Sequence, residues 1–322
     1  PALAAGNAVV IKSPEVSPLA MTFLIRACER AGLPDGAVNL LCGKGSQVGA
    51  HLVTHPETNQ IVFTGSVPTG QRILYDAAQR ATPSVMELGG KSAGIVHADA
   101  DIEQVVSSVH AGIFFNAGQV CSALSRLLVH RSRFDEVVER CRELAESLSI
   151  GPGVHNPDLT PLVSREQLDH VEGMCRRAID AGATCVTGGE RVSGMQGYFM
   201  QPTLFVDVAV DSDIFQQEVF GPVLVIHPFD NEEEAVELAN ATAYGLVAGV
   251  FDTQLDRALR TARRLRGGQV FINEWFAGGV ETPFGGVGLS GFGREKGQEA
   301  LYSYVQTRNI AIRLKPQPGR VS

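Results

Sequence analysis

Short apolar runs alternate with amphipathic, helix-length segments over the first 97 residues. The runs lie at residues 8–12, 38–42, 60–64, 84–88 and 93–97. Apolar runs of this length, separated by helical segments, are typical of parallel strands buried on both faces. Ser17 and Pro18 open the first helical segment, and Gly32 and Pro34 end it. The pattern predicts a βαβ arrangement for this part of the chain.

A second alternating block follows from residue 101 to about residue 292. Strands are expected at residues 126–130, 184–187, 223–227, 246–251 and 269–272, and helices at 102–116, 134–147, 165–181, 232–241 and 254–265. Two segments rich in Gly and Pro, 151–161 and 278–293, are loops that are exposed or functional. The pattern therefore predicts an α/β protein with two domains.

The end of the chain has a different pattern. Residues 301–314 alternate between apolar and polar side chains, as a half-buried strand does, and no partner strand lies nearby in the sequence. An open strand edge invites aggregation. We expect this strand to pair with another segment or with another subunit.

Composition narrows the classes of partner. The formal charge of −8 over 322 residues argues against a nucleic-acid partner. The densest basic run, residues 260–266, has helical spacing and is interpreted as a solvated helix face. No stretch reaches the ~18 apolar residues of a membrane helix.

The six cysteines form no CxxC pair and have no clustered histidines, so we predict neither a metal site nor a disulfide framework. With no apolar leader in the sequence, this indicates a reducing, cytoplasmic location. The chain begins at Pro1, and we expect it to be a fragment or a processed product.

Cys121 is a candidate nucleophile. It follows a Gly-containing turn (FFNAGQVCS) after a predicted helix and before a predicted strand. A thiol on such a loop can lie near backbone N–H donors that favour the thiolate. A free cysteine is more often a small buried apolar side chain, and that interpretation stays open.

Glu87 is a candidate general base. It lies in MELGGKS, where an apolar strand meets a Gly-Gly turn at the carboxyl end of a predicted parallel sheet. A carboxylate that is half-buried there has a raised pKa and can take a proton from water. The alternative is a surface glutamate that ends a strand.

The first domain also holds candidate phosphate and ribose contacts. FTGSVPTG, residues 63–70, follows a strand and opens a helix whose N-terminus favours an anion, although two glycines there can serve packing alone. Lys12 and Glu15, just past the first strand, lie where a dinucleotide's ribose is held in such folds. Both can equally be surface charges.

Together these segments resemble the aldehyde dehydrogenase superfamily along nearly the whole chain. The matching motifs are PALAAGNAVVIKSPE, IVFTGSVPTG, MELGGKS, FFNAGQVCS, QEVFGPV and PFGGVGLSGFGREKG, in that family's order. The resemblance implies a Rossmann-like cofactor domain that is incomplete at its N-terminus (residues 1–88), an α/β catalytic domain (89–293) and a C-terminal helix with an oligomerisation strand (294–322).

The resemblance also implies roles for individual residues. Cys121 is the nucleophile and Glu87 the base. The cofactor contacts are Lys12, Glu15, Gly45, Gly65, Ser66, Gly70 and Leu88, with Glu218 and Phe220 holding the nicotinamide ribose. Glu15 favours NAD over NADP because its charge repels a 2′-phosphate.

The implied activity is NAD-dependent oxidation of an aldehyde to the carboxylic acid. The alternatives are a relative that acylates coenzyme A and a non-catalytic protein that keeps the fold. Complete relatives are longer at the N-terminus and supply there an Asn of the oxyanion hole, so we expect this chain to be N-terminally truncated and its activity to be uncertain. The complete enzyme is expected to be a homodimer or homotetramer.

Substrate features point in two directions. CSALSRLLVH is similar to betaine-aldehyde and aminoaldehyde dehydrogenases, whereas the loop at residues 273–279 is similar to a broader bacterial-type group. Trp275 and Phe276 can offer a cation–π wall to an ammonium aldehyde, helped by Glu274, or they can simply pack the loop.

Overall fold

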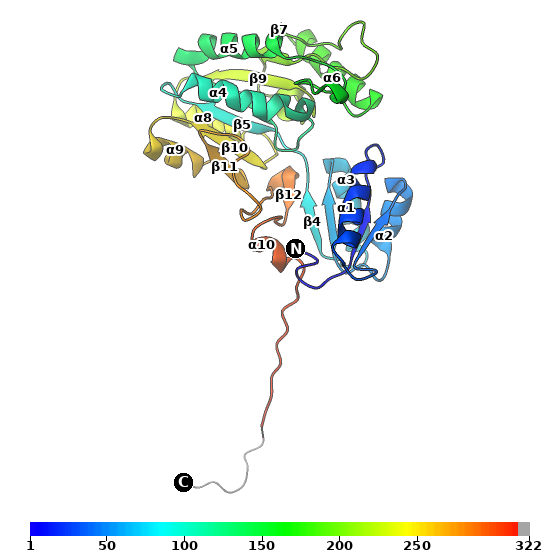
Figure 1. Ribbon diagram of the computed structural model, residues 1–322. Helices are drawn as coiled ribbons and strands as arrows, with labels where there is room; N and C mark the ends of the chain where they lie inside the picture. Colours follow the sequence, from blue (N-terminus) through cyan, green and yellow to red (C-terminus); the bar gives the residue numbers. More distant parts are fainter. Residues whose placement is uncertain (315–322) are drawn as a thin grey trace, which may run out of the picture.

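The structure is a computed structural model that describes residues 1–314. It has two lobes joined between strands β4 and β5 (Figure 1). Within the described residues, no helix has the length and apolar composition needed to cross a lipid bilayer. In both lobes strands and helices alternate, which confirms the predicted α/β class.

The first lobe contains two small sheets. Helix α1 connects the parallel strands β1 and β2, and helix α3 connects the parallel strands β3 and β4. The bounds are β1 Val9–Lys12, α1 Leu19–Arg30, β2 Val38–Leu41, α2 Ala50–Thr54, β3 Ile61–Thr64, α3 Val67–Ala78 and β4 Ser84–Glu87. A two-residue strand from far along the chain, β12 (Gly291–Phe292), joins β4 in antiparallel pairing.

The prediction that the early strands are buried on both faces was wrong for β1 and β2. None of their residues is fully buried, and α1 has no buried residue at all. The buried cluster of this lobe consists of five residues: Val53, Ile61, Ala77, Met86 and Leu88. The described residues therefore cover the apolar side chains of β1 and β2 only in part.

The second lobe is built on a seven-stranded sheet in the order β11-β10-β5-β6-β9-β8-β7, in which only β7 is antiparallel to its neighbour. The strands are β5 Ser92–Val96, β6 Leu124–His130, β7 Thr184–Thr187, β8 Thr203–Val206, β9 Val223–Phe229, β10 Val247–Phe251 and β11 Gln269–Ile272. The sequence pattern did not predict β8.

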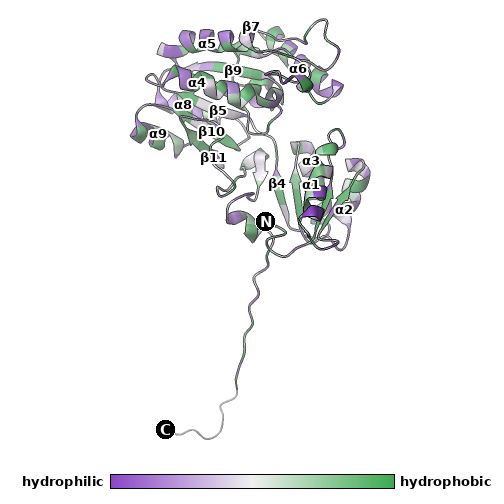
Figure 2. Ribbon diagram, viewed as in Figure 1, coloured by the Kyte–Doolittle hydropathy of each residue, from purple (hydrophilic) through white to green (hydrophobic). Residues whose placement is uncertain are grey.

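Helices cover both faces of this sheet (Figure 2, where the central strands are green and the outer helices mixed). One buried cluster lies under α4 and α5, and the other under α6, α8 and α9. The helices are α4 Ile102–Val109, α5 Phe134–Ser147, α6 Arg165–Asp180, α7 Asp213–Gln216, α8 Glu232–Asn240, α9 Leu255–Ala262 and α10 Glu299–Tyr302.

Two predicted elements differ from the structure. The helix expected at 102–116 ends as α4 at Val109 and continues as a π-helical and then a 3-10 turn, His110–Phe114 and Phe115–Gly118. The strand expected at 301–314 starts with the end of α10, and no strand is assigned to the rest of it within the described residues. Pairing of this tail with another subunit stays a prediction, and residues 315–322 lie outside the described part.

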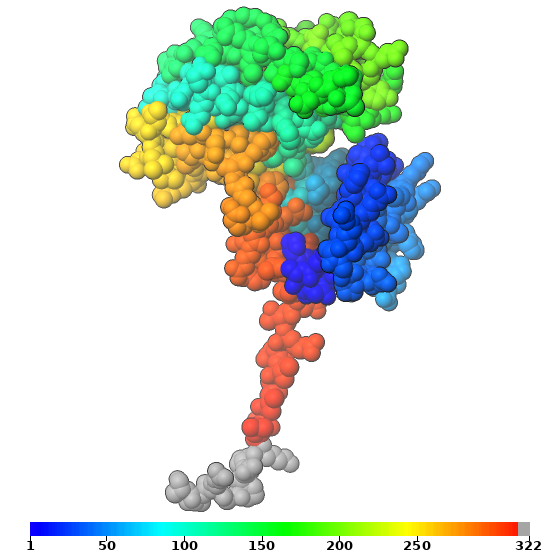
Figure 3. Space-filling model, in the orientation of Figure 1, coloured from blue at the N-terminus to red at the C-terminus, as the bar shows by residue number. Residues whose placement is uncertain are grey.

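Strand β12 connects the lobes. It falls inside the range predicted for the catalytic domain, yet it pairs with β4 of the first lobe. In the space-filling view this orange part of the chain lies between the two lobes (Figure 3). The domain boundaries therefore stay a prediction, with the chain returning to the first lobe near residue 291.

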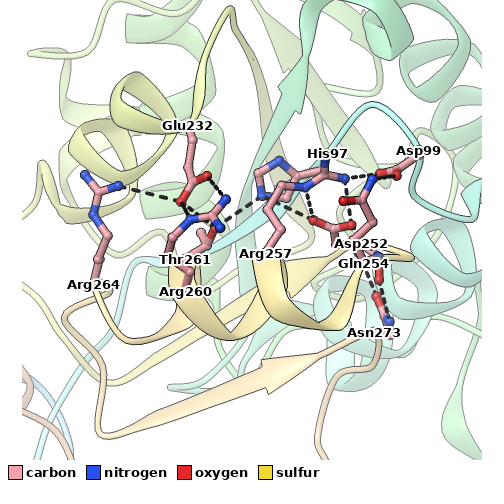
Figure 4. Close-up of polar contacts among 10 residues, drawn as sticks. All are labelled: His97, Asp99, Glu232, Asp252, Gln254, Arg257, Arg260, Thr261, Arg264 and Asn273. Atoms are coloured by element: carbon pink, nitrogen blue, oxygen red, sulfur yellow. Dashed lines mark hydrogen bonds and ion pairs between the residues drawn. The ribbon is translucent and has the colours of Figure 1, made fainter.

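A polar network closes the carboxyl ends of β5, β10 and β11 (Figure 4). The Asp252 carboxylate, whose side chain is fully buried, accepts hydrogen bonds from Arg257 and from the backbone of Gln254. His97 Nε2 lies 3.8 Å from it. Arg260 and Arg264 of the basic run pair with Glu232, which agrees with the predicted solvated, charged helix face.

We expect Asp252→Ala to lower the free energy of unfolding by ~2–4 kcal/mol, because it leaves the Gln254 N–H without its partner and leaves the Arg257 guanidinium with Asp99 as its remaining carboxylate. Urea denaturation measures the change. Glu233→Ala is the matched control, since Glu233 pairs with Arg264 while 72% exposed; it should change stability by less than ~0.5 kcal/mol. Equal effects of the two substitutions would contradict the structural role of the network.

Candidate active site

The turn that carries Cys121 is held in an unusual backbone conformation. Asn116, Ala117 and Gly118 have φ values of 51°, 53° and 71° in succession. A Cβ atom at Gly118 would lie 2.0 Å from the carbonyl oxygen of Gly221, so a larger residue is excluded there. Asn116 and Gln119 exchange side-chain hydrogen bonds with each other's carbonyls. This strained segment ends the preceding helix and places Cys121 just before the start of β6.

The thiol of Cys121 is half-buried, and two carboxylates face it. Its pKa is raised to about 11, mainly by burial and then by the charges of Glu218 and Glu87, against the backbone N–H groups of Ser122 and Cys121, which lower it. The sequence had indicated a turn that favours the thiolate. The N–H donors are present, but burial and the two carboxylates outweigh them.

Glu87 is the last residue of β4 and is only 2% exposed. Neither of its carboxylate oxygens has a hydrogen-bond partner within the described residues. Its pKa is raised to about 8, mainly by burial and then by the charge of Glu295, against the charge of Arg294, which lowers it. The raised pKa agrees with the sequence-based expectation for a base at this position.

The Gly89-Gly90 turn brings these groups together. A Cβ atom at Gly89 would lie 2.3 Å from Glu218 Oε2, and one at Gly90 would lie 2.3 Å from the carbonyl oxygen of Cys121. The Gly90 N–H donates to Glu218 Oε1 at 3.0 Å. Only residues without a side chain let a carboxylate and the Cys121 backbone approach this turn from two sides.

The Gly-rich segment around Ser290 braces the same turn. Its hydroxyl donates to the Gly89 carbonyl at 2.7 Å and accepts from the Gly245 N–H at 3.0 Å. The backbone of Leu88 donates to the Ser290 carbonyl, and Gly291 of β12 pairs with Glu87. The sequence indicated that this segment was an exposed or functional loop but did not assign Ser290 a role; a serine inside a Gly-rich motif was the available signal.

Glu218 and Phe220 follow α7 on a loop that a side chain of α6 holds. Gln167 Nε2 donates to the carbonyls of Val219 and Phe220, at 3.1 Å and 2.9 Å. Phe220 has a φ of 54°. Burial raises the pKa of Glu218, whereas the Gly90 N–H and Lys91 lower it. The structure thus brings Glu218 to the candidate catalytic pair.

Lys12, Glu15 and Gly45 come together at the carboxyl ends of β1 and β2. Glu15 accepts a hydrogen bond from the Gly45 N–H, where a short π-helical turn begins, and Lys12 Nζ lies 3.9 Å from Glu15. Glu15 is exposed, so both carboxylate oxygens can be reached from solvent. The three residues form one polar surface.

Gly65, Ser66 and Gly70 surround the start of α3. Ser66 precedes the helix in extended conformation, and no side chain caps the helix N-terminus. A Cβ atom at Gly70 would lie 2.6 Å from Leu88 Cδ2, so this glycine lets α3 pack closely on the strand that carries Glu87. The first N–H groups of α3 therefore have no side-chain partner.

The comparisons with known proteins agree with this geometry. The sequence profile of the aldehyde dehydrogenase family matches residues 1–310. The mitochondrial aldehyde dehydrogenase of Leishmania tarentolae is 42% identical over 312 residues, which are 96% of this chain and 62% of that protein. The 2-hydroxymuconic semialdehyde dehydrogenase of Pseudomonas sp. strain CF600 is 42% identical over 322 residues, with 98% and 66% covered.

A solved structure shows the same likeness. The crystal structure of betaine aldehyde dehydrogenase from Staphylococcus aureus in complex with NAD+ matches with a TM-score of 0.91 and 37% identity, over 94% of this chain and 61% of that one. The chain belongs to the aldehyde dehydrogenase family. It spans less than two thirds of the length of these aldehyde dehydrogenase relatives.

We expect Gly90→Ala in this aldehyde dehydrogenase chain to displace the Cys121 turn, because the new methyl group would overlap the Cys121 carbonyl oxygen. The rate of Cys121 alkylation by iodoacetamide, followed by peptide mass spectrometry, should change at least tenfold while the protein stays folded. Gly173→Ala in α6 is the control, since its nearest neighbour to a new Cβ is Arg177 at 3.5 Å. An unchanged alkylation rate in Gly90→Ala would rule out the contact.

Glu87 should also set a pH dependence of stability. Because its pKa rises from 4.5 to about 8 in the folded protein, the unfolded chain ionises first, and stability is lost as pH rises from about 4.5 to about 8. Glu87→Gln removes this loss. The free energy of unfolding of Glu87→Gln minus that of wild type should therefore increase by roughly 2–4 kcal/mol from pH 5 to pH 9. A pH-independent difference in urea denaturation would show that Glu87 ionises normally.

Proposed function

We propose that this protein oxidises an aldehyde to the carboxylic acid with NAD as the oxidant. One observation carries the proposal: a half-buried thiol and a buried carboxylate without a partner meet at the same Gly-Gly turn. Leaving a carboxylate buried and unpaired destabilises the fold. A catalytic use of its proton affinity explains why it is there.

The first half of the reaction uses Cys121. The thiol loses its proton to solvent, and the thiolate adds to the aldehyde carbon, which forms a thiohemiacetal. The Cys121 backbone N–H can donate to the oxyanion as it develops. Loss of hydride from the carbon leaves a thioester on Cys121.

The second half uses Glu87. The ionised carboxylate takes a proton from a water molecule, and that water attacks the thioester carbon. The carbon–sulfur bond breaks, the carboxylic acid leaves, and Glu87 passes the proton that it took from water to the Cys121 sulfur. No hydrogen-bond donor within the described residues competes for the Glu87 oxygens, so they can accept from water.

The described residues fit a dinucleotide. The N-terminus of α3 lacks a capping side chain and lies behind Gly65 and Ser66, so it can receive a pyrophosphate. Glu15 and Lys12 offer a carboxylate and an ammonium for ribose hydroxyls. Glu218 would hold the nicotinamide ribose. When bound, the nicotinamide supplies the hydride acceptor.

The substrate is proposed only as an aldehyde, because the relatives are named for different ones. Of the two interpretations of Trp275, its burial supports packing: the side chain is 7% exposed and cannot form a cation–π wall with substrate. Phe276 remains exposed and stacks edge-to-face on Phe115, with ring centroids 6.3 Å apart. These two rings, on the segments that flank the nucleophile turn, are the candidate substrate contacts.

The assembly of the complete enzyme is also a proposal. The tail carries Ile310, Ile312 and Leu314 at 72–82% exposure. An alternating apolar edge of this kind is stabilised when it adds to the sheet of a second subunit. A homodimer or homotetramer is the assembly that this favours.

We expect Glu87→Gln to release one burst of reduced cofactor per Cys121 and then to turn over at least ~10²-fold more slowly than wild type, since hydride loss does not need the base and deacylation does. Cys121→Ala should show neither phase. Stopped-flow absorbance of reduced cofactor with a panel of aldehydes measures both. Cys141→Ala, at a buried thiol in α5, is the control and should keep both phases.

The same assay separates the alternatives. It is run on this 322-residue chain and on the longest product of its gene, with and without coenzyme A. Turnover that requires coenzyme A would replace the hydrolytic proposal by acyl transfer. Cofactor binding without turnover in either form would favour a non-catalytic protein that keeps the fold.

We expect NAD to be preferred over NADP, because Glu15 would meet a 2′-phosphate with like charge. Glu15→Ser should lower the ratio of kcat/KM for NAD to kcat/KM for NADP at least tenfold. Glu57→Ser, at an exposed glutamate elsewhere in the same lobe, should leave the ratio unchanged. Equal kcat/KM for both cofactors in wild type would contradict the placement of Glu15 at the ribose.

A further inference from the structure

The single tryptophan of the chain lies directly beneath the nucleophile turn. Trp275 follows β11 and is 7% exposed. Its indole Nε1–H donates to the carbonyl oxygen of Ser122 at 3.0 Å, in a buried hydrogen bond between segments 153 residues apart. Ser122 is the residue next to Cys121, so a side chain from the far end of the sheet contacts the turn that carries the thiol.

The ring is fixed by close packing on three sides. A Cβ atom at Gly249 of β10 would lie 2.6 Å from Trp275 Cζ3, and one at Gly112 would lie 3.1 Å from Trp275 Cδ1. Phe271 packs edge-to-face against the indole, with ring centroids 5.6 Å apart. Two glycines therefore leave the space that the indole fills, and the position of its N–H is determined by the sheet.

Cys121 and Ser122 lie in a turn formed by residues 120–123. The Ala123 N–H donates to the Val120 carbonyl at 3.0 Å, which leaves Cys121 and Ser122 at the two corners. The peptide between Ser122 and Ala123 is thus tied at its N–H within the turn and at its carbonyl to Trp275. The preceding peptide carries the Ser122 N–H, one of the two backbone donors near the Cys121 sulfur.

We propose that Trp275 is a positioning residue for Cys121: its indole N–H fixes the Ser122 carbonyl and so holds the backbone donors of the turn toward the sulfur. The proposal deepens the proposed function and rests on it for the role of Cys121 as nucleophile. Trp275 itself touches no reacting atom. Its action passes through the Ser122 backbone.

The charged groups that face the sulfur are Glu87, from β4, and Glu218, from the loop after α7. Both oppose formation of the thiolate, and only the backbone donors favour it. If the donors lose their orientation, the thiol needs a higher pH to react. A loss of packing alone leaves the donors in place and does not move that pH.

The test compares Trp275→Phe, which removes the N–H and keeps an aromatic ring, with Phe271→Leu, which loosens the same packing and keeps the hydrogen bond. Alkylation of Cys121 by iodoacetamide is measured from pH 6 to pH 11 by peptide mass spectrometry, on protein that circular dichroism shows to be folded. This range lies at or below the thiol pKa of about 11, so the alkylation rate in Trp275→Phe should fall about three- to tenfold at each pH, which displaces the profile by about 0.5–1 pH unit, the effect of one lost buried hydrogen bond.

A second pair of measurements keeps the test decisive if Trp275→Phe does not fold. Replacing the Trp275 indole by the isosteric benzothiophene, through an unnatural amino acid, exchanges N–H for sulfur without changing the ring shape and should give the same shift. In wild type, alkylation of Cys121 should change the tryptophan emission, whereas the Cys121→Ala protein treated in the same way should show no change.

For aldehyde oxidation, kcat should fall while KM for NAD stays within twofold in Trp275→Phe. Equal pH profiles in Trp275→Phe, Phe271→Leu and wild type would overturn the proposal, as would an unshifted profile in the benzothiophene protein. If wild type shows the predicted thiol profiles but oxidises no aldehyde, the positioning of Cys121 stands and the proposed oxidation fails.

Discussion

The constraint on which the site depends is the exclusion of side chains from the Gly89-Gly90 turn. Glu218 lies on one side of the turn and the Cys121 backbone on the other, each closer to the glycine backbone than a Cβ atom would allow. Three segments distant from the end of β4 meet there: the Cys121 turn, the Glu218 loop and the Ser290 segment. Without this close approach, Glu87 and Cys121 would share no site.

The site lowers the stability of the folded state, and the surrounding fold compensates for it. A buried carboxylate without a partner, three consecutive residues with positive φ and a thiol facing two carboxylates each raise the free energy of the folded state. The seven-stranded sheet, with buried clusters on both faces and a polar network across the ends of three strands, supplies the compensating stability. The strain lies where the proposed chemistry takes place.

The sequence predicted most elements of both lobes, because apolar runs and helical periodicity reflect local burial. It predicted the end of β4 to within one residue and the start of β6 to within two, and therefore placed Glu87 and Cys121 at loop edges. It missed β8 and left open whether Trp275 contacts substrate or packs the loop. Burial of Trp275 depends on Gly112 and Gly249, which lie far away in the chain. Contacts between residues so far apart leave no local pattern in the sequence.

The most direct test of the account is the mass of the intermediate on Cys121. The Glu87→Gln protein is mixed with NAD and an aldehyde, quenched in acid within a second and digested for peptide mass spectrometry. The account predicts that the peptide containing Cys121 gains the mass of the acyl group and that alkaline hydroxylamine removes it. Reduced cofactor formed without any acyl mass on that peptide would contradict the assignment of Cys121 as the nucleophile.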